Sequence, residues 1–171
     1  MIKYKKLKGC ARRTAAALFV ICNFLFLIPP ASAESISASV LKKNDVKRLA
    51  REIKKKADVN ERDWFGRTPL MKAARFNAAE SAALLIKNGA EINAVDKNGW
   101  TALMWASIEC SSSAVKLLID MGADVTVCDN LGYTALMFAE NKECAEISAM
   151  LKEALKRTAV INTRNKGGKV K

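Results

Sequence analysis

The same block of sequence occurs three times in tandem at a constant step, and this period constrains the fold more than any other feature of the chain. The segment GRTPLM at 66–71 returns as GWTALM at 99–104 and as GYTALM at 132–137. An aspartate precedes each segment at the same distance, at positions 63, 96 and 129. Self-similarity at a fixed period of this size is typical of an architecture in which structural units stack on one another. The sequence therefore predicts a stacked-repeat protein.

The repeated residues resemble the ankyrin repeat, whose pattern contains D-x-x-G-x-T-P-L and ends with L-L-x-x-G-A-D-V-N. The end of that pattern stands as GAEIN at 89–93 and GADVT at 122–126, and the resemblance covers residues 40–155. It implies an all-α solenoid of helix-turn-helix repeats joined by hairpin-like loops. It also implies a scaffold that binds another protein, without naming that protein.

Local signals place the ends of the helices. Thr68, Thr101 and Thr134 are expected to cap the first helix of each repeat, since a hydroxyl there accepts from a free backbone N–H. Gly89 and Gly122 suit the left-handed position that closes the second helix.

The ends of the array depart from the pattern, as capping units do. Residues 40–60 resemble only the second helix of a repeat, and Lys152 and Leu155 replace an isoleucine and a closing glycine of the earlier repeats. After residue 158, Asn, Lys and Gly predominate, which predicts disorder. The expected organisation is a cleaved signal peptide at 1–33, an N-terminal capping half-repeat at 34–60, ankyrin repeats at 61–93, 94–126 and 127–157 (the last a C-terminal cap), and a basic disordered tail at 158–171.

Residues 1–33 have the three parts of a secretory signal peptide. A lysine- and arginine-rich start precedes an apolar run at 15–28, and Ala31-Ser32-Ala33 forms a small-residue cleavage site. This apolar run is shorter than the roughly 20 residues that span a bilayer, so an uncleaved anchor is the weaker alternative. We expect cleavage after Ala33 and a periplasmic or secreted protein.

Positive charge is concentrated at both ends of the expected mature chain. Residues 34–171 carry 23 basic and 17 acidic groups, a net charge of +6. The repeat body at 61–151 is slightly acidic, with 8 basic and 12 acidic residues, whereas 152–171 holds 7 basic residues and 1 acidic residue.

Little in the chain points to catalysis. It contains no histidine, which removes the commonest general base and the commonest metal ligand. The aspartates Asp63, Asp96 and Asp129 recur with the repeat, so we interpret them as turn residues rather than catalytic ones. We expect no enzyme activity, catalytic residue, metal, cofactor or small-molecule substrate.

The mature chain would contain three cysteines, an odd number for an oxidising compartment. Cys110 and Cys144 fall in nearly equivalent turns of adjacent repeats, offset by one position from the repeat period. Equivalent atoms of stacked repeats lie about 10 Å apart, beyond the roughly 7 Å reach of a disulfide, although the offset could close the gap. The sequence leaves their pairing open, and Cys128 is expected to be free.

Subtracting the repeat framework leaves the candidate binding residues. These occupy the loop tips and the exposed positions of the first helices, where members of the resembled family contact partners. All seven aromatic residues after residue 33 are among them. Aromatic and arginine side chains carry much of the energy of protein interfaces. The candidates are Trp64, Phe65, Arg67, Arg75, Phe76, Trp100, Trp105, Ile108, Leu131, Tyr133 and Phe138.

A structural role is the alternative interpretation for about half of the seven rings. Trp105 and Phe138 could wedge between helices, and Trp100 and Tyr133 could pack loop against loop. Trp64, Phe65, Arg67 and Arg75 are the stronger candidates for contact with a partner.

Two partner classes remain. An apolar patch rimmed by polar groups favours a protein partner, bound by a monomer through its concave loop-and-helix face. The resemblance suggests toxin immunity, support of a stress enzyme or a host-directed factor as settings. The alternative is binding of anionic lipid or nucleic acid through the basic C-terminal tail, which is the less favoured hypothesis.

Overall fold

A computed structural model describes residues 35–167, with side chains described as far as residue 159. Residues 34–171 belong to one compact unit. The predicted signal peptide at 1–33 lies outside the described residues, as does the end of the chain at 168–171.

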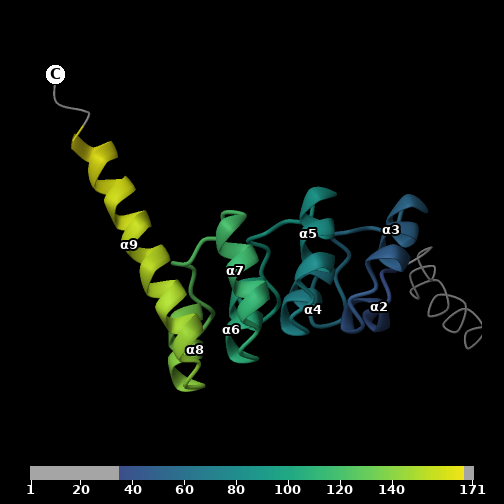
Figure 1. The fold of residues 1–171 in the computed structure, drawn as a ribbon, viewed down its shortest axis with the longest axis horizontal. Helices are drawn as coiled ribbons and strands as arrows, with labels where there is room; N and C mark the ends of the chain where they lie inside the picture. The colour runs from purple at the N-terminus through teal and green to yellow at the C-terminus, as the bar shows by residue number, and fades with distance from the viewer. Residues whose placement is uncertain (1–34, 168–171) are drawn as a thin grey trace, which may run out of the picture. The chain divides into compact units, whose positions relative to one another are not determined.

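Within the described part, helices follow one another in pairs that repeat along the unit (Figure 1). Contacts run between the first helices of successive pairs and between the second helices of successive pairs. This is the arrangement expected of stacked repeats, and it confirms the predicted all-helical class. The helices are α2 (Ala38–Lys42), α3 (Val46–Lys54), α4 (Pro69–Arg75), α5 (Ala79–Lys87), α6 (Ala102–Ile108), α7 (Ser112–Asp120), α8 (Ala135–Asn141) and α9 (Ala145–Gly167).

The first helix of each full repeat begins at the predicted threonine. The hydroxyl oxygens of Thr68, Thr101 and Thr134 accept from the backbone N–H groups of Met71, Met104 and Met137, at 3.4, 3.3 and 3.4 Å. Pro69 occupies the first helical position of α4, where its missing N–H is not needed. These three helix starts are therefore confirmed.

The repeated aspartates shape the loops. One Asp63 carboxylate oxygen accepts from the amides of Phe65 and Arg67, at 3.0 and 2.9 Å. Asp96 and Asp129 make the same pair of bonds in their own loops. Each loop also bonds to the next: the Lys97 amide donates to the Phe65 carbonyl, at 3.1 Å. The aspartates thus hold the loops in one conformation, as predicted for turn residues.

The core lies between the helices of each pair and continues from pair to pair. Leu70 and Leu103 of the first helices and Leu85 and Leu118 of the second helices are buried. Alanines at the helix crossings, such as Ala73 and Ala106, are also buried, which allows the helices to approach closely. No single pair could bury its apolar face, so stacking supplies the core.

The turn between the two helices of each pair has a residue with positive φ, which recurs with the period of the repeat. Asn44, Asn77, Cys110 and Glu143 have φ of 49°, 54°, 53° and 57°. In the first two turns this residue also reaches into the next pair. The Ser81 amide donates to the Asn44 side-chain oxygen, and the Ala114 amide donates to that of Asn77, both at 3.0 Å.

The N-terminal segment corrects one prediction. Residues 34–60 were expected to form a half-repeat with the second helix alone, but α2 and α3 make a complete pair, with α2 packed against α4. Val40 and Leu41 of α2 are buried, and this apolar contact explains why so short a helix forms.

The C-terminal end corrects a second prediction. Residues 158–171 were expected to be disordered, but α9 continues to Gly167. The second helices α5 and α7 are followed closely by Gly89 and Gly122, whose φ values are 90° and 86°. Leu155 stands at the equivalent position in α9, so nothing there stops the helix. Among the described helices, none is sufficiently long and apolar to cross a membrane.

Candidate functional site

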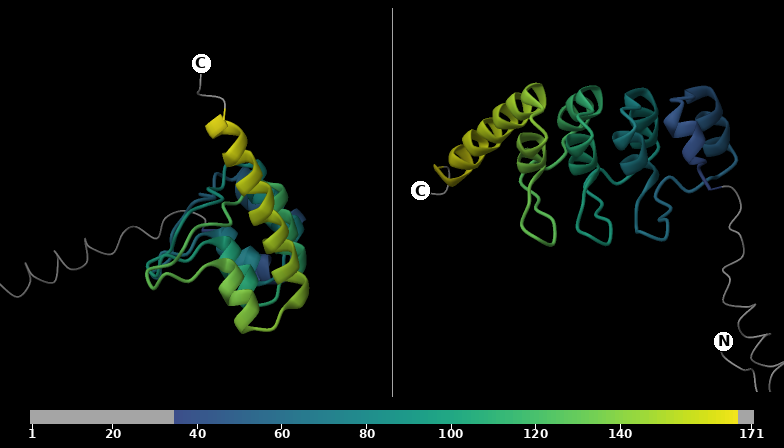
Figure 2. Two further views of the ribbon diagram at one scale, coloured as in Figure 1. Left: turned by 90° about the vertical axis from the view of Figure 1, so that its left-hand side faces the viewer. Right: turned by 90° about the horizontal axis from the view of Figure 1, so that it is seen from below.

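The three loops project from the same side of the stack and lie next to one another (Figure 2). We define the loop face as the loops at 61–68, 94–101 and 127–134 together with helices α4, α6 and α8. Every candidate binding residue predicted from the sequence lies in these segments, or immediately after α4 in the case of Phe76. The repeat therefore brings residues far apart in the sequence onto one face.

The loop tips expose large apolar side chains. Trp64 and Leu131 are 84% and 81% exposed, and Phe65 and Tyr133 are 61% and 49% exposed. An aspartate-held loop keeps these tips in place, so the side chains are presented without a change in the backbone. Exposed apolar groups held in this way are typical of a surface that contacts another protein.

The inner part of the loop face is a row of rings in tilted contact that crosses from the second repeat to the third. The Trp100 ring centroid lies 4.8 Å from that of Trp105 and 4.6 Å from that of Phe138. Tyr133 follows at 5.9 Å from Phe138. Trp100, Trp105 and Phe138 are half-buried and pack on the core, so these three rings support the repeat boundary as well as lining the face.

Cations cover the rings at the boundary between the first and second repeats. The Arg67 guanidinium lies 4.8 Å from the Phe65 ring centroid, and the Arg75 guanidinium lies 5.4 Å from that of Trp105. Arg75 also pairs with Glu109 of the next repeat, at 2.9 Å. The Lys97 ammonium lies 5.1 Å from the centroid of the exposed Trp64 ring, so even this loop tip has a charged neighbour.

Asp63 anchors this group of cations. Its second carboxylate oxygen lies 2.9 Å from the Arg67 guanidinium and 3.2 Å from the Lys72 ammonium. Burial of the carboxyl opposes ionisation, but hydrogen bonds from the Arg67 amide and guanidinium and from Lys72, with the Lys72 charge, lower the pKa of Asp63 to about 2. The carboxylate is therefore charged throughout the neutral range and pairs with both cations, of which Arg67 lies beside the Phe65 and Trp105 rings.

Two predicted residues contribute less to the exposed surface. Phe76 is half-buried and packs against the core, and Ile108 is half-buried at the end of α6. Met137 of α8 was not among the candidates, although it is 49% exposed. The sequence signal is its place in the last of the three repeats. Its equivalents Met71 and Met104 are buried, whereas no further repeat stacks on Met137 within the described residues.

Cys110 and Cys144 are joined by a disulfide, with their Cα atoms 5.8 Å apart. This distance is shorter than the spacing of about 10 Å between equivalent atoms of adjacent repeats, and it lies within the roughly 7 Å reach of a disulfide. Cys110 occupies the turn position from which Asn44 and Asn77 reach into the next pair, and the one-residue offset places Cys144 within its reach. The bridge takes the place of that inter-repeat hydrogen bond. Among the described residues, Cys128 is a free and exposed cysteine, as predicted.

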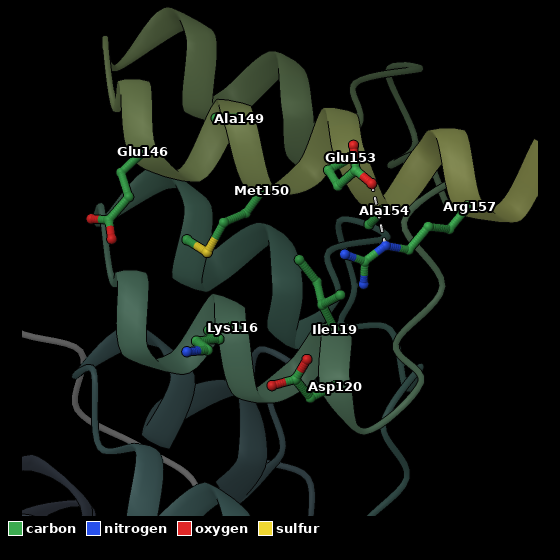
Figure 3. A pocket seen from close by; sticks show the side chains of 9 residues that line it. All are labelled: Lys116, Ile119, Asp120, Glu146, Ala149, Met150, Glu153, Ala154 and Arg157. Atoms are coloured by element: carbon green, nitrogen blue, oxygen red, sulfur yellow. Dashed lines mark hydrogen bonds and ion pairs between the residues drawn. The ribbon is translucent and has the colours of Figure 1, made fainter.

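A hollow of about 490 Å³ lies between α7 and α9 and was not predicted (Figure 3). Ile119 of α7 and Met150 of α9 line its apolar part, and the Glu153–Arg157 ion pair stands at its edge. It belongs to the second helices and not to the loop face. The sequence signal was the missing glycine at 155, which lets α9 run past the length of α7.

The described residues contain no cluster of three or more His, Cys, Asp or Glu side chains that could hold a metal ion. The loop face is therefore a contact surface of exposed rings, half-buried rings and paired cations, and the aspartates hold its loop backbones in place.

Comparison with known proteins agrees with the repeat geometry. The family of ankyrin repeats (3 copies) matches residues 36–129 and 95–165, which together cover most of the chain. No curated protein matches the sequence. Paired helices, aspartate-held loops and this match lead to one conclusion: the chain belongs to the ankyrin-repeat family, whose members serve as protein–protein interaction modules and are generally not enzymes.

Proposed function

We propose that this protein is exported and binds a single protein partner through the loop face as a monomer, without catalysing a reaction. The observation that carries the proposal is the row of exposed tips, Trp64, Phe65 and Leu131, beside the half-buried rings and paired arginines. Aromatic and arginine side chains next to a partly desolvated centre are the usual carriers of binding energy.

Export is supported by two independent features. The predicted signal peptide provides the route, and the Cys110–Cys144 disulfide suits an oxidising compartment such as the periplasm or the cell exterior. The test is to express the full chain and sequence the N-terminus of the product found outside the cytoplasm. A chain that starts at Glu34 supports the proposal, and a chain that keeps residues 1–33 in the cytoplasm contradicts it.

The partner proposal is tested by capture from native envelope extract. The bait is the chain from Glu34, used beside a variant with Trp64→Ala, Phe65→Ala and Arg75→Ala. The matched control carries Lys87→Ala, Lys116→Ala and Met121→Ala, three changes on or after the second helices α5 and α7. We expect the wild type and the control to capture the same protein and the loop-face variant to lose it.

Two results would count against this assignment. If all three baits capture the same protein, the exposed tips do not form the binding surface. If only lipid or nucleic acid is recovered, and salt releases it, the basic C-terminal segment becomes the better candidate.

A further inference from the structure

Between the loops of the second and third repeats lies a hollow of about 470 Å³ that opens on the loop face. The rings of Trp100, Tyr133 and Phe138 line it, together with Leu131 at the loop tip. The side chains of Asn98 and Asn130 complete the lining. The hollow is therefore mainly apolar, with three rings in its lining, and is large enough to admit a long side chain.

A buried carboxylate is part of the lining. Asp129 lines the hollow and is 7% exposed. Its oxygens accept from the Trp100 indole N–H at 2.9 Å and from the amides of Leu131 and Tyr133, at 2.9 and 2.8 Å. Within residues 35–159, no lysine or arginine forms an ion pair with Asp129. Its carboxylate is hydrogen-bonded, but the described residues provide no cation for its charge.

The first repeat provides a comparison, because its equivalent carboxylate has cationic partners. There the equivalent carboxylate, Asp63, pairs with Arg67 and Lys72. Two repeats further along the chain, Tyr133 and Phe138 stand at the positions of these two cations. The third repeat thus keeps the carboxylate and replaces both cations with rings. Ring faces attract a cation, so the rings and the carboxylate favour the same kind of ligand.

The surrounding charge points the same way. Residues 94–151, which include the second repeat and most of the third, carry three lysines and eight carboxylates. A negative region of this kind attracts a positively charged partner surface and repels an acidic one.

We propose that the hollow between the second and third repeats receives the cationic side chain, arginine or lysine, of the partner protein. The partner's cation would lie between Trp100 and Tyr133 near Asp129, in the role that Arg67 has beside Asp63 in the first repeat. This inference rests on the proposed function, because it names the chemistry by which the loop face recognises its partner.

The test follows the three indole N–H signals of Trp64, Trp100 and Trp105 by NMR in the oxidised chain from Glu34. The probes are acetyl-arginine amide, its neutral isostere acetyl-citrulline amide, and acetyl-leucine amide. We expect the arginine probe to shift the Trp100 signal in a saturable manner while leaving Trp64 in place. The citrulline and leucine probes should shift it little.

Two variants separate the hollow from the rest of the molecule. Tyr133→Leu removes one ring of the lining and should weaken binding of the arginine probe about two- to fivefold, in line with the strength of an exposed cation–ring contact. Met121→Leu, at an exposed position after α7 and outside the loop face, should leave binding unchanged. Because Tyr133 is half exposed, its replacement leaves the core intact, and unchanged spectra of the remaining signals would verify this.

Any of four results would overturn the inference. Equal shifts with arginine and citrulline would remove the role of charge, and a larger shift with leucine would assign the hollow to an apolar side chain. A Trp100 shift that depends on protein concentration without probe would assign it to a second copy of the chain. If capture depends on the loop face but the arginine probe has no effect, this inference fails and the proposed function stands. If the arginine probe shifts the Trp100 signal but capture does not depend on the loop face, the hollow binds a cation and the proposed function fails.

Discussion

The two boundaries inside the repeat body have the same backbone and different means of support. Between the first and second repeats, Arg75 pairs with Glu109, and arginines cover the Trp105 ring. Between the second and third, the Trp100 ring packs at a tilt against the Phe138 ring, and the Cys110–Cys144 disulfide joins the turns. One boundary depends on exposed charges and the other on ring packing and a covalent bond. The comparison shows that the repeat fixes where the contacts fall, while their chemistry differs from one boundary to the next.

The disulfide should make the largest single contribution to this difference. Replacing both partners, Cys110→Ser and Cys144→Ser, should lower the free energy of unfolding by about 3–4 kcal/mol, the chain-entropy value for a loop of this size. Urea unfolding of the oxidised chain and of the variant measures it. Cys128→Ser is the matched control and should change stability by less than about 0.5 kcal/mol, because its side chain is exposed. Equal stability of the two cysteine variants would show that the disulfide does not stabilise the folded state.

The loop contact between the second and third repeats gives the next effect. Gly99 has φ of 81°, and a Cβ there would lie 2.9 Å from the Asn130 amide nitrogen. Gly132 has φ of 85° but open space around it. Gly132→Ala should cost about 1–2 kcal/mol for the left-handed backbone alone. Gly99→Ala should cost about 3 kcal/mol, because the crowding adds a further contribution. Thermal unfolding compares them, and equal losses would mean that the two loops do not press on each other.

The stability contributed by the two boundaries should depend differently on salt. Phe138→Leu removes two ring contacts and should cost about 1–2 kcal/mol at low and high salt alike. Arg75→Met keeps an apolar stem but removes the pair with Glu109, in which both side chains are about 40% exposed. Its loss should be below about 1 kcal/mol and should shrink as salt is added. Unfolding at low salt and at about 1 M salt is the measurement, and a loss at Arg75 that ignores salt would contradict the ionic description.

The smallest effect concerns pH. Because the pKa of Asp63 is lowered to about 2, its ionised form stabilises the folded state at neutral pH. A depressed folded-state pKa means that this contribution is full above the unfolded-state pKa, near 4, and is lost as pH falls toward 2. Solvent screening limits it to at most about 1 kcal/mol. Asp63→Asn should therefore be less stable than the wild type at pH 7, with the gap closing by pH 2. A gap that widens in acid would reverse the assignment.

The sequence predicted the stack because each repeat has the same local signals. Thr68 and its equivalents cap helices through a bond to a residue three positions away, which the sequence alone can indicate. The turn aspartates act over two and four positions, and they were interpreted as turn residues because they recur with the repeat. Contacts of this range need no knowledge of the tertiary fold.

Contacts between repeats were harder to predict. Asn44 and Asn77 bond to residues 37 positions away, and the Cys110 bridge follows the same geometry, but the sequence does not show that a turn residue points toward the next unit. The length of α9 was missed for a different reason. The composition after 158 suggested disorder, while the absent glycine at 155 was the more informative signal.

Site-specific photo-crosslinking in living cells shows whether the exposed rings of the loop face contact a partner protein. A photoreactive phenylalanine analogue placed at Trp64 samples a loop tip, and the same analogue at Met121 samples an exposed position after α7. We predict a discrete protein adduct from position 64 and none from position 121. An adduct from position 121 alone, or identical adducts from both, would contradict binding through the loop face.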